Sequence, residues 1–143
     1  MITLPHFGLI QVLICYETLF PGVAGGPGSR PEMLVNLTND AWFGDTPGPW
    51  QHLEQARMRA VEEGIPMIRV ANTGVTAAFD PSGRVLGRIG LGETGFIDVA
   101  VPASLPPTVY AGWREWPFMA LLLLLALFNI RLDRKQSIRH QKR

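Results

Sequence analysis

The sequence predicts a layered α/β sheet protein with an apolar segment near its C-terminus. Three observations predict it: short apolar runs of strand length, one amphipathic helix between them, and a hairpin signal late in the chain. The 143 residues have room for one modest domain. The 47% hydrophobic and 17% charged content is that of a folded protein and excludes an intrinsically disordered one.

The first half of the body contains signals for two strands and a helix. Residues 9–14 form an almost continuous apolar run, typical of a strand buried on both faces. The Gly/Pro-rich residues 21–32 are expected to cover a shortened or irregular helix, and residues 33–39 predict a second buried strand. Pro49 suits the first turn of a helix that ends at Gly64. The apolar stripe of that helix consists of Leu53, Ala56, Ala60 and Val61.

The second half of the body contains shorter strands joined by turns. We expect a third strand over residues 67–71 and a fourth over 75–79. The sequence DPSG at 80–83 predicts a turn into a hairpin strand over 84–89. The alternating stretch GFIDVAVP at 95–102 predicts a last strand.

Charge is distributed unevenly along the chain. From Arg131 onward there are six Lys and Arg residues against Asp133, which leaves seven basic and eleven acidic residues from the totals of 13 and 12. The body is therefore mildly acidic and the tail strongly basic. The first ten residues lack a basic stretch and a small-residue cleavage site, so they do not predict a signal peptide.

An uncharged and almost wholly apolar run occupies residues 116–130. At about 1.5 Å per residue, it is shorter than a hydrocarbon core roughly 30 Å thick. Extension to Tyr110 gives about 21 residues and places Trp113 and Trp116 where an aromatic belt is expected. We therefore expect a transmembrane helix over 110–132, with a buried core helix as the alternative. The basic tail would then lie in the cytoplasm and the body on the other side.

The single cysteine, Cys15, follows the first predicted strand directly. One cysteine excludes an internal disulfide, and no Cys/His cluster has the spacing of metal ligands. Cys15 is either a small buried hydrophobe or a nucleophile, which would need a base or cation to form its thiolate. His6, His52 and His140 are poor partners for it, because His52 is expected on the polar side of the helix and the others outside the strands. Glu17 is close in sequence and suited to orienting a neighbour.

Two polar loops follow predicted strands and are candidates for a binding pocket. Residues 39–45, with the sequence NDAWFGD, combine polar groups with two aromatic side chains. Asn72 and Thr73 end a strand in the same way. The alternative is a pair of turns with Asn and Asp caps and aromatics packed beneath them.

These residues together resemble a known family. The stretch ICYE at 14–17 and the stretch NLTNDAWFGDTPGPWQHLEQARMRAVEEG at 36–64 are similar to apolipoprotein N-acyltransferases, within the nitrilase, or carbon–nitrogen hydrolase, superfamily. The strand ending in cysteine and the NTGVT and DPSG elements are shared widely in the superfamily. NDAWFGD, ARMRAVE and the apolar segment with its basic tail are more specific to the acyltransferases.

The resemblance implies a protein of the bacterial inner membrane whose catalytic part, an αββα sandwich, lies on the periplasmic side and whose C-terminus lies in the cytoplasm. Cys15 would take an acyl chain from a phospholipid as a thioester and pass it to the N-terminal diacylglyceryl-cysteine of an apolipoprotein. The backbone N–H of Tyr16 would stabilise the oxyanion and Glu17 would shape the site. No cofactor, metal or nucleic acid is implied. The substrate-binding candidates are Trp42, Asn39, Asn72 and Thr73.

The sequence departs from the family pattern in one respect. The resemblance implies a Glu base and a Lys oxyanion partner upstream of the cysteine, but residues 1–14 contain neither, and the lysines are Lys135 and Lys142. We therefore interpret residues 1–109 as the C-terminal half of the catalytic domain, followed by a transmembrane segment at 110–132 and a tail at 133–143.

Three interpretations of function stay open at this point. The first is a part of an apolipoprotein N-acyltransferase that is inactive and poorly folded alone, because missing strands leave sheet edges unpaired. The second is a membrane-tethered nitrilase-type amidase that uses Cys15 with water as the acceptor. The third is a catalytically dead, membrane-anchored fragment.

Overall fold

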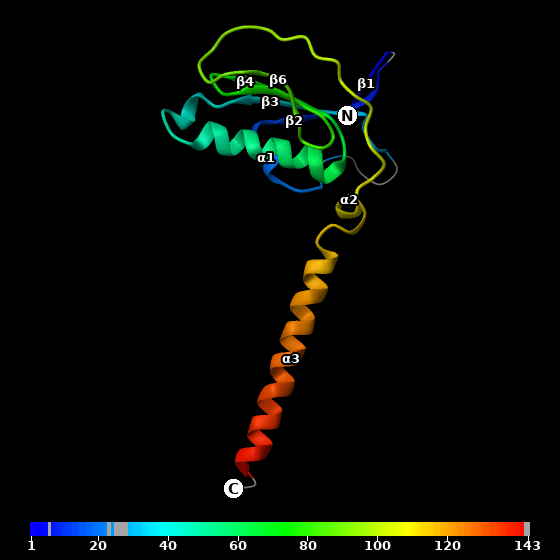
Figure 1. The fold of residues 1–143 in the computed structure, drawn as a ribbon, viewed down its shortest axis with the longest axis vertical. Coiled ribbons are helices and arrows are strands. Elements are labelled where there is room, and N and C mark those ends of the chain that lie inside the picture. Colours follow the sequence, from blue (N-terminus) through cyan, green and yellow to red (C-terminus); the bar gives the residue numbers. More distant parts are fainter. Residues whose placement is uncertain (6, 23, 25–28, 142–143) are drawn as a thin grey trace. The chain divides into compact units, whose positions relative to one another are not determined.

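The computed structural model describes residues 1–5, 7–22, 24 and 29–141 (Figure 1). The chain divides into two compact units, the first formed by Met1–Ala111 and the second beginning at Gly112. His6 lies outside the described residues, as does part of the loop expected at 21–32.

The first unit is built on one mixed sheet of six strands, which lie in the order of the sequence (Figure 1). The three central strands β2, β3 and β4 run parallel, and the outer strands β1, β5 and β6 are antiparallel to their neighbours. The predicted α/β class with a layered sheet is therefore confirmed. The strands are β1 (Ile2–Leu4), β2 (Gly8–Ile14), β3 (Met33–Asn39), β4 (Met67–Asn72), β5 (Thr76–Phe79) and β6 (Val85–Ile89).

Helical segments follow β2 and β3 at the edge of the sheet where the carboxyl ends of the parallel strands lie. The 3₁₀ helix η1 (Cys15–Leu19) follows β2, while η2 (Ala41–Phe43) and α1 (Gly48–Glu63) follow β3. Because β2, β3 and β4 are parallel and in close register, their carboxyl ends meet at the same edge. In open α/β sheets this edge is where ligands bind.

Helix α1 covers one face of the sheet (Figure 1). Pro49 lies in its first turn, and Gly64 ends it with a left-handed φ of 65° that glycine adopts without strain. The predicted apolar stripe is confirmed except for Val61, which is exposed because it lies about 100° around the helix from the buried Ala60. The core that α1 shares with the rest of the first unit consists of Leu13, Ala24, Leu34, Leu53, Ala56, Ala60, Ile65, Met67, Val75, Ala77 and Phe79.

The opposite face of the central strands is apolar and exposed. Ile14 on β2, Leu37 on β3 and Val70 on β4 are neighbours in register, and all three side chains are exposed. The resemblance implied a sandwich of two sheets between two helix layers. The described residues of the first unit contain one sheet with one long helix on it, which leaves this second face uncovered.

The prediction of a strand at residues 95–102 is wrong. These residues form no ladder with the sheet, and Phe96 is 88% exposed. Ile97 and Val99 do lie against β6, where Gly87 leaves room: an added Cβ there would meet Val99 at 2.9 Å. The apolar alternation thus reflects side-chain packing on the sheet, without the backbone pairing that defines a strand.

The helix predicted over 110–132 also differs from the structure. The chain forms α2 (Val109–Trp113) and α3 (Trp116–Gln141), and Arg114, with a left-handed φ of 49°, separates them. Within the residues that the structure describes, no helix is both long enough and apolar enough to cross a membrane, so the predicted transmembrane helix is not supported. The boundaries proposed at 109 and 132 stay predictions.

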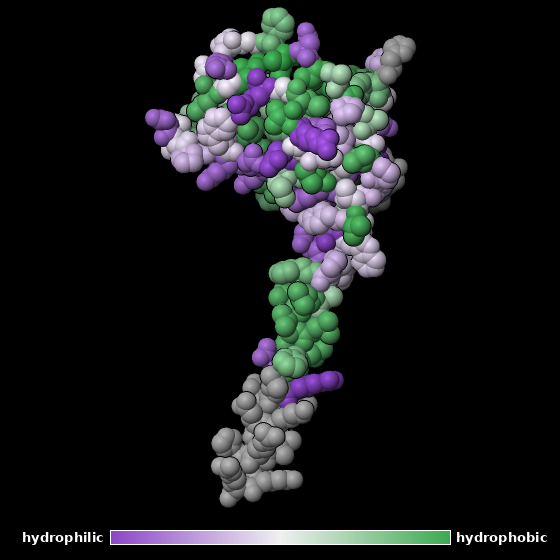
Figure 2. Space-filling view, in the orientation of Figure 1, coloured by the Kyte–Doolittle hydropathy of each residue, from purple (hydrophilic) through white to green (hydrophobic). Residues whose placement is uncertain are grey.

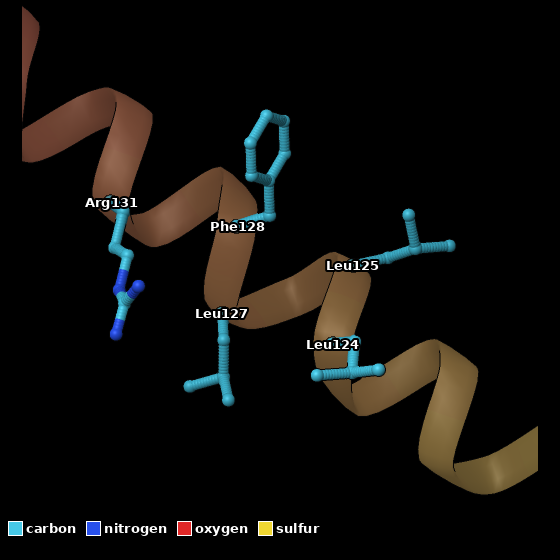
Figure 3. Close-up of a pocket in the computed structure, with 5 residues that line it drawn as sticks. All are labelled: Leu124, Leu125, Leu127, Phe128 and Arg131. Carbon is cyan, nitrogen blue, oxygen red and sulfur yellow. The ribbon is translucent and has the colours of Figure 1, made fainter.

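The first turns of α3 have an apolar surface, as Figure 2 shows. A hollow of about 410 Å³ lies among the side chains labelled in Figure 3, which are Leu124, Leu125, Leu127, Phe128 and Arg131. All five project from one helix, so the hollow is a groove between neighbouring side chains and has no second wall.

Two leucines of β3 test this assignment of faces. Leu34 is fully buried under α1, and Leu37 is 43% exposed on the other face. We expect Leu34→Ala to lower the free energy of unfolding by about 2–5 kcal/mol, because it leaves a cavity. Leu37→Ala should cost less than about 1 kcal/mol. Urea unfolding followed by circular dichroism measures both, and equal losses would contradict the assignment.

Candidate active site

Cys15 lies at the first turn beyond β2, in an unusual backbone conformation. Its φ is 51°, in the left-handed region that non-glycine residues rarely adopt and that is enriched at functional sites. Its carbonyl oxygen accepts hydrogen bonds from Thr18 Oγ1 and Asn36 Nδ2, each at 3.3 Å. The half-buried cysteine therefore sits on a backbone that two side chains hold in place.

The sulfur of Cys15 has a polar neighbour on the next strand. Thr38 Oγ1 lies 3.5 Å from Cys15 Sγ and 3.2 Å from Asp40 Oδ1. The threonine thus connects the sulfur to a carboxylate that lies just beyond the end of β3.

Asp40 belongs to a network of buried polar side chains behind the cysteine. Its Oδ2 accepts a hydrogen bond from Arg69 Nη2 at 2.6 Å, and its Oδ1 lies 3.0 Å from His52 Nδ1. Arg69 also donates to Asn36 Oδ1 at 2.5 Å and to the carbonyl of Val75 at 3.3 Å. Burial lowers the pKa of Arg69, and the carboxylate of Asp40 opposes that shift. The guanidinium is held by three acceptors on three segments of the chain.

Gly74 makes room for this carboxylate. A Cβ at Gly74 would lie 2.4 Å from Asp40 Oδ2, closer than real Cβ atoms approach any atom. The glycine is required here by space, since its φ is not in the left-handed region.

Aromatic rings cluster around Tyr16, the residue that follows Cys15. Tyr16 meets Trp42 edge-on at 5.3 Å between ring centroids, and Trp42 stacks on Phe43 at 4.8 Å. Desolvation raises the pKa of Tyr16, and the negative charges of Cys15 and Asp40 add to this. Trp42 is 62% exposed. A hollow of about 250 Å³ adjoins the rings and is lined by Tyr16, Leu19, Phe43, Gly48, Gln51, His52 and Gln55.

Glu17 caps the short helix that begins at Cys15. Its Oε2 accepts a hydrogen bond from the backbone N–H of Ile14 at 2.7 Å. Glu17 therefore fixes the turn at the cysteine, while the ring of Tyr16, the next residue, contacts Trp42. The structure brings these predicted site residues together.

The remaining predicted site residues lie at the ends of β3 and β4. Asn39 Oδ1 accepts from the backbone N–H of Ala41 at 3.1 Å, and Asn72 offers its carbonyl to the N–H of Asp40 at 3.1 Å. Thr73 has a left-handed φ of 57° and donates to the carbonyl of Asn72 at 2.6 Å. Asn72 and Thr73 border a separate hollow of about 290 Å³, which residues 92–95 also line.

The prediction for His52 is wrong. It was expected on the polar side of its helix, but its side chain is 2% exposed and contacts Asp40 and Thr18, the latter at 3.3 Å. Asp40 and Arg69 were not singled out at all. An arginine in the middle of a buried strand was an available signal, because a buried charge requires a partner. Among the described residues, no group of three or more His, Cys, Asp or Glu side chains could hold a metal ion.

Comparison with known proteins establishes the family. The carbon–nitrogen hydrolase family model matches residues 2–110. This chain belongs to the carbon–nitrogen hydrolase family.

Similar curated proteins come from a narrower group. Apolipoprotein N-acyltransferases from Bradyrhizobium diazoefficiens, Rhodopseudomonas palustris and Rickettsia bellii are 51%, 47% and 40% identical to it, over 90%, 90% and 88% of this chain. The matches cover 24%, 24% and 26% of those proteins, so the chain spans about a quarter of their length. That it is their C-terminal part stays a prediction.

Solved structures support the fold of the first unit. Two structures of an amidase from Nesterenkonia sp. AN1 each give a TM-score of 0.50, at 21% and 19% identity. They match 83% and 84% of this chain, and 47% and 48% of the amidase. Likeness at this level of identity shows the fold alone, and that fold is the nitrilase-like α/β fold that the resemblance implied.

The buried network can be tested through Asp40. Replacing Asp40 by Asn leaves the positive charge of Arg69 buried without its counter-ion, so we expect a loss of about 3–5 kcal/mol in the free energy of unfolding. The matched control is Asp45→Asn in the same loop, which is exposed and should change stability by less than about 0.5 kcal/mol. Urea midpoints measure both, and a neutral Asp40→Asn would show that the ion pair contributes little.

Proposed function

We propose that this chain carries the nucleophile of an enzyme that moves an acyl group from a phospholipid to the N-terminal diacylglyceryl-cysteine of an apolipoprotein. The observation that carries the proposal is Cys15, held in a left-handed conformation at the carboxyl end of a central parallel strand, with its sulfur beside a hydroxyl. The apolipoprotein N-acyltransferases to which the chain is similar favour this substrate class over others in the family.

The first half-reaction loads the cysteine. The thiolate of Cys15 attacks the carbonyl carbon of a phospholipid ester, a C–S bond forms, and the C–O bond to the glycerol breaks. The proton that left the thiol ends on the hydroxyl of the lysophospholipid. The N–H of Tyr16 belongs to the first turn of η1, where helical N–H groups have no intrahelical acceptor, and it would donate to the developing oxyanion.

The second half-reaction transfers the acyl group to nitrogen. The amine of the acceptor attacks the thioester, a C–N bond forms, the C–S bond breaks, and the amine proton returns to the sulfur. A thioester divides one difficult acylation into two easier steps. The exposed ring of Trp42 would line the path of the acyl chain, and Asn39, Asn72 and Thr73 would contact the polar parts of the substrates.

The mechanism also needs a base that removes the proton from the thiol of Cys15. Asp40 Oδ2 already accepts a hydrogen bond from Arg69, and Asp40 Oδ1 lies 3.0 Å from His52 Nδ1, so both oxygens are engaged inside the buried network. The resemblance implies a Glu base and a Lys oxyanion partner, and we propose that a protein of the relatives' length supplies both. The proposed activity therefore belongs to that longer protein, and this chain contributes the nucleophile.

A chimera tests this proposal. The matching segment of the Bradyrhizobium diazoefficiens protein would be replaced by this chain and supplied with vesicles of acyl-labelled phospholipid. We expect a hydroxylamine-sensitive acyl adduct on Cys15, seen by mass spectrometry, and transfer of the label to a diacylglyceryl-cysteine peptide. Cys15→Ala should abolish both, with a loss of at least about a thousandfold in transfer.

Two outcomes would contradict the proposal. An adduct that persists in the Cys15→Ala chimera would remove Cys15 as the nucleophile. An adduct that forms on Cys15 but passes only to water, even with the peptide present, would favour an amidase-type hydrolase.

A location at the bacterial inner membrane, with the site facing the periplasm, is part of this proposal because both substrates are lipid-linked. Cys15 is the single cysteine of the chain, so thiol labelling reports on it alone. In intact spheroplasts that produce the chimera with Cys15 as its single cysteine, a membrane-impermeant maleimide should label Cys15 as fully as after permeabilisation. Labelling only after permeabilisation would place the site in the cytoplasm.

A further inference from the structure

The hydroxyl of Thr38 lies between two acceptors and has one proton. Thr38 Oγ1 is 3.5 Å from Cys15 Sγ and 3.2 Å from Asp40 Oδ1. A hydroxyl donates one hydrogen bond and accepts through its lone pairs, so it cannot donate to the sulfur and to the carboxylate at the same time. The acceptor that receives the proton must depend on the charge of each.

Asp40 does not depend on Thr38 for its hydrogen bonds. Arg69 donates to one carboxylate oxygen at 2.6 Å, and His52 Nδ1 lies 3.0 Å from the other. The carboxylate is fully buried and keeps its ion pair with Arg69 when the threonine turns away. His52 Nδ1, which also lies 3.2 Å from Arg69 Nη2, donates to Asp40 only in the ring form that carries the Nδ1 proton. When the Thr38 hydroxyl turns to the sulfur, the negative charge of Asp40 therefore stays paired with Arg69.

The cysteine cannot follow the threonine by moving its backbone. The carbonyl of Cys15 is held by Thr18 Oγ1 and by Asn36 Nδ2, and Asn36 is itself fixed by Arg69. The distance from sulfur to hydroxyl is thus set by the same buried network that holds the carboxylate. When negative charge develops on the sulfur, rotation of the Thr38 O–H bond alone is therefore enough to bring a donor to it.

We propose that Thr38 is a positioning residue whose hydroxyl changes acceptor with the protonation of Cys15. With Cys15 as a thiol, its S–H donates to Thr38 Oγ1 and the threonine donates to Asp40. With Cys15 as a thiolate, the threonine rotates and donates to the sulfur. The Thr38 proton stays on its oxygen throughout, and no covalent bond of Thr38 changes. The inference rests on the proposed function only in taking Cys15 as the nucleophile.

The test measures the thiolate directly and needs no acyl transfer. The rate of alkylation of Cys15 by iodoacetamide is followed against pH on the full chain, where it is the single cysteine. Thr38→Val keeps the shape of the side chain and removes the hydroxyl. We expect the midpoint of its rate profile to rise by about one pH unit, which lowers the thiolate fraction at neutral pH about tenfold.

Thr38→Ser is the matched control, because it keeps the hydroxyl and loses only a methyl group. The midpoint of this variant should lie within about 0.3 pH units of that of the unchanged chain. If Thr38 acted only through its methyl group, Thr38→Ser would shift the midpoint as well. If Thr38→Val does not fold by circular dichroism, Thr38→Ala replaces it. An unchanged midpoint in the folded variant without the hydroxyl, or an equal shift in Thr38→Ser, would overturn the proposal.

Failure of the proposed function gives a different result. Suppose that the chimera transfers no acyl group but the midpoint of the rate profile depends on the Thr38 hydroxyl. The role proposed for Thr38 would then be supported and the proposed acyl transfer contradicted. Full acyl transfer, with a midpoint that does not change when the Thr38 hydroxyl is removed, would support the proposed function and contradict the role proposed for Thr38.

Discussion

The ion pair between Asp40 and Arg69 is the interaction on which the rest of the site depends. It joins the loop after β3 to the middle of β4, and through His52 it reaches α1. Withdrawing two charges from water is costly, and a protein in which apolar residues of similar volume replace a buried ion pair is often equally stable. What the pair provides is geometry: with both oxygens of Asp40 held, the threonine beside the sulfur and the backbone of Cys15 have defined positions.

Much of the fold could be predicted from the sequence, because apolar runs bounded by Gly, Pro and polar loops are strong signals. The strand at 33–39 and the helix ending at Gly64 are confirmed, and each of the other two central strands differs from its prediction by one residue. The strand at 95–102 failed because alternation reports which side chains face a surface and not whether the backbone is paired. β1 was missed because three exposed residues leave no pattern to detect.

The site could be predicted only where it follows the sheet. Cys15 was singled out because it follows a strand, and Glu17 and Trp42 because they stand next to it or in the following loop. The roles that the resemblance implies for them stay predictions. The charged network was not found, because its contacts join residues 12 to 33 positions apart, across a strand, a loop and a helix. His52 shows the difficulty: a polar residue on a helix is usually exposed, and only the position of Asp40 explains why this one is buried.

The close approach of Gly74 to Asp40 has an evolutionary consequence. Any side chain at position 74 would push the carboxylate out of place, so a change there is tolerated only if the residue at position 40 becomes smaller. A smaller residue at 40 would in turn leave Arg69 without its partner, which favours loss of that charge as well. The three positions should therefore covary among related sequences. A relative that lacks the glycine is expected to lack the acidic and basic residues too, and to hold the end of its β2 strand by other contacts.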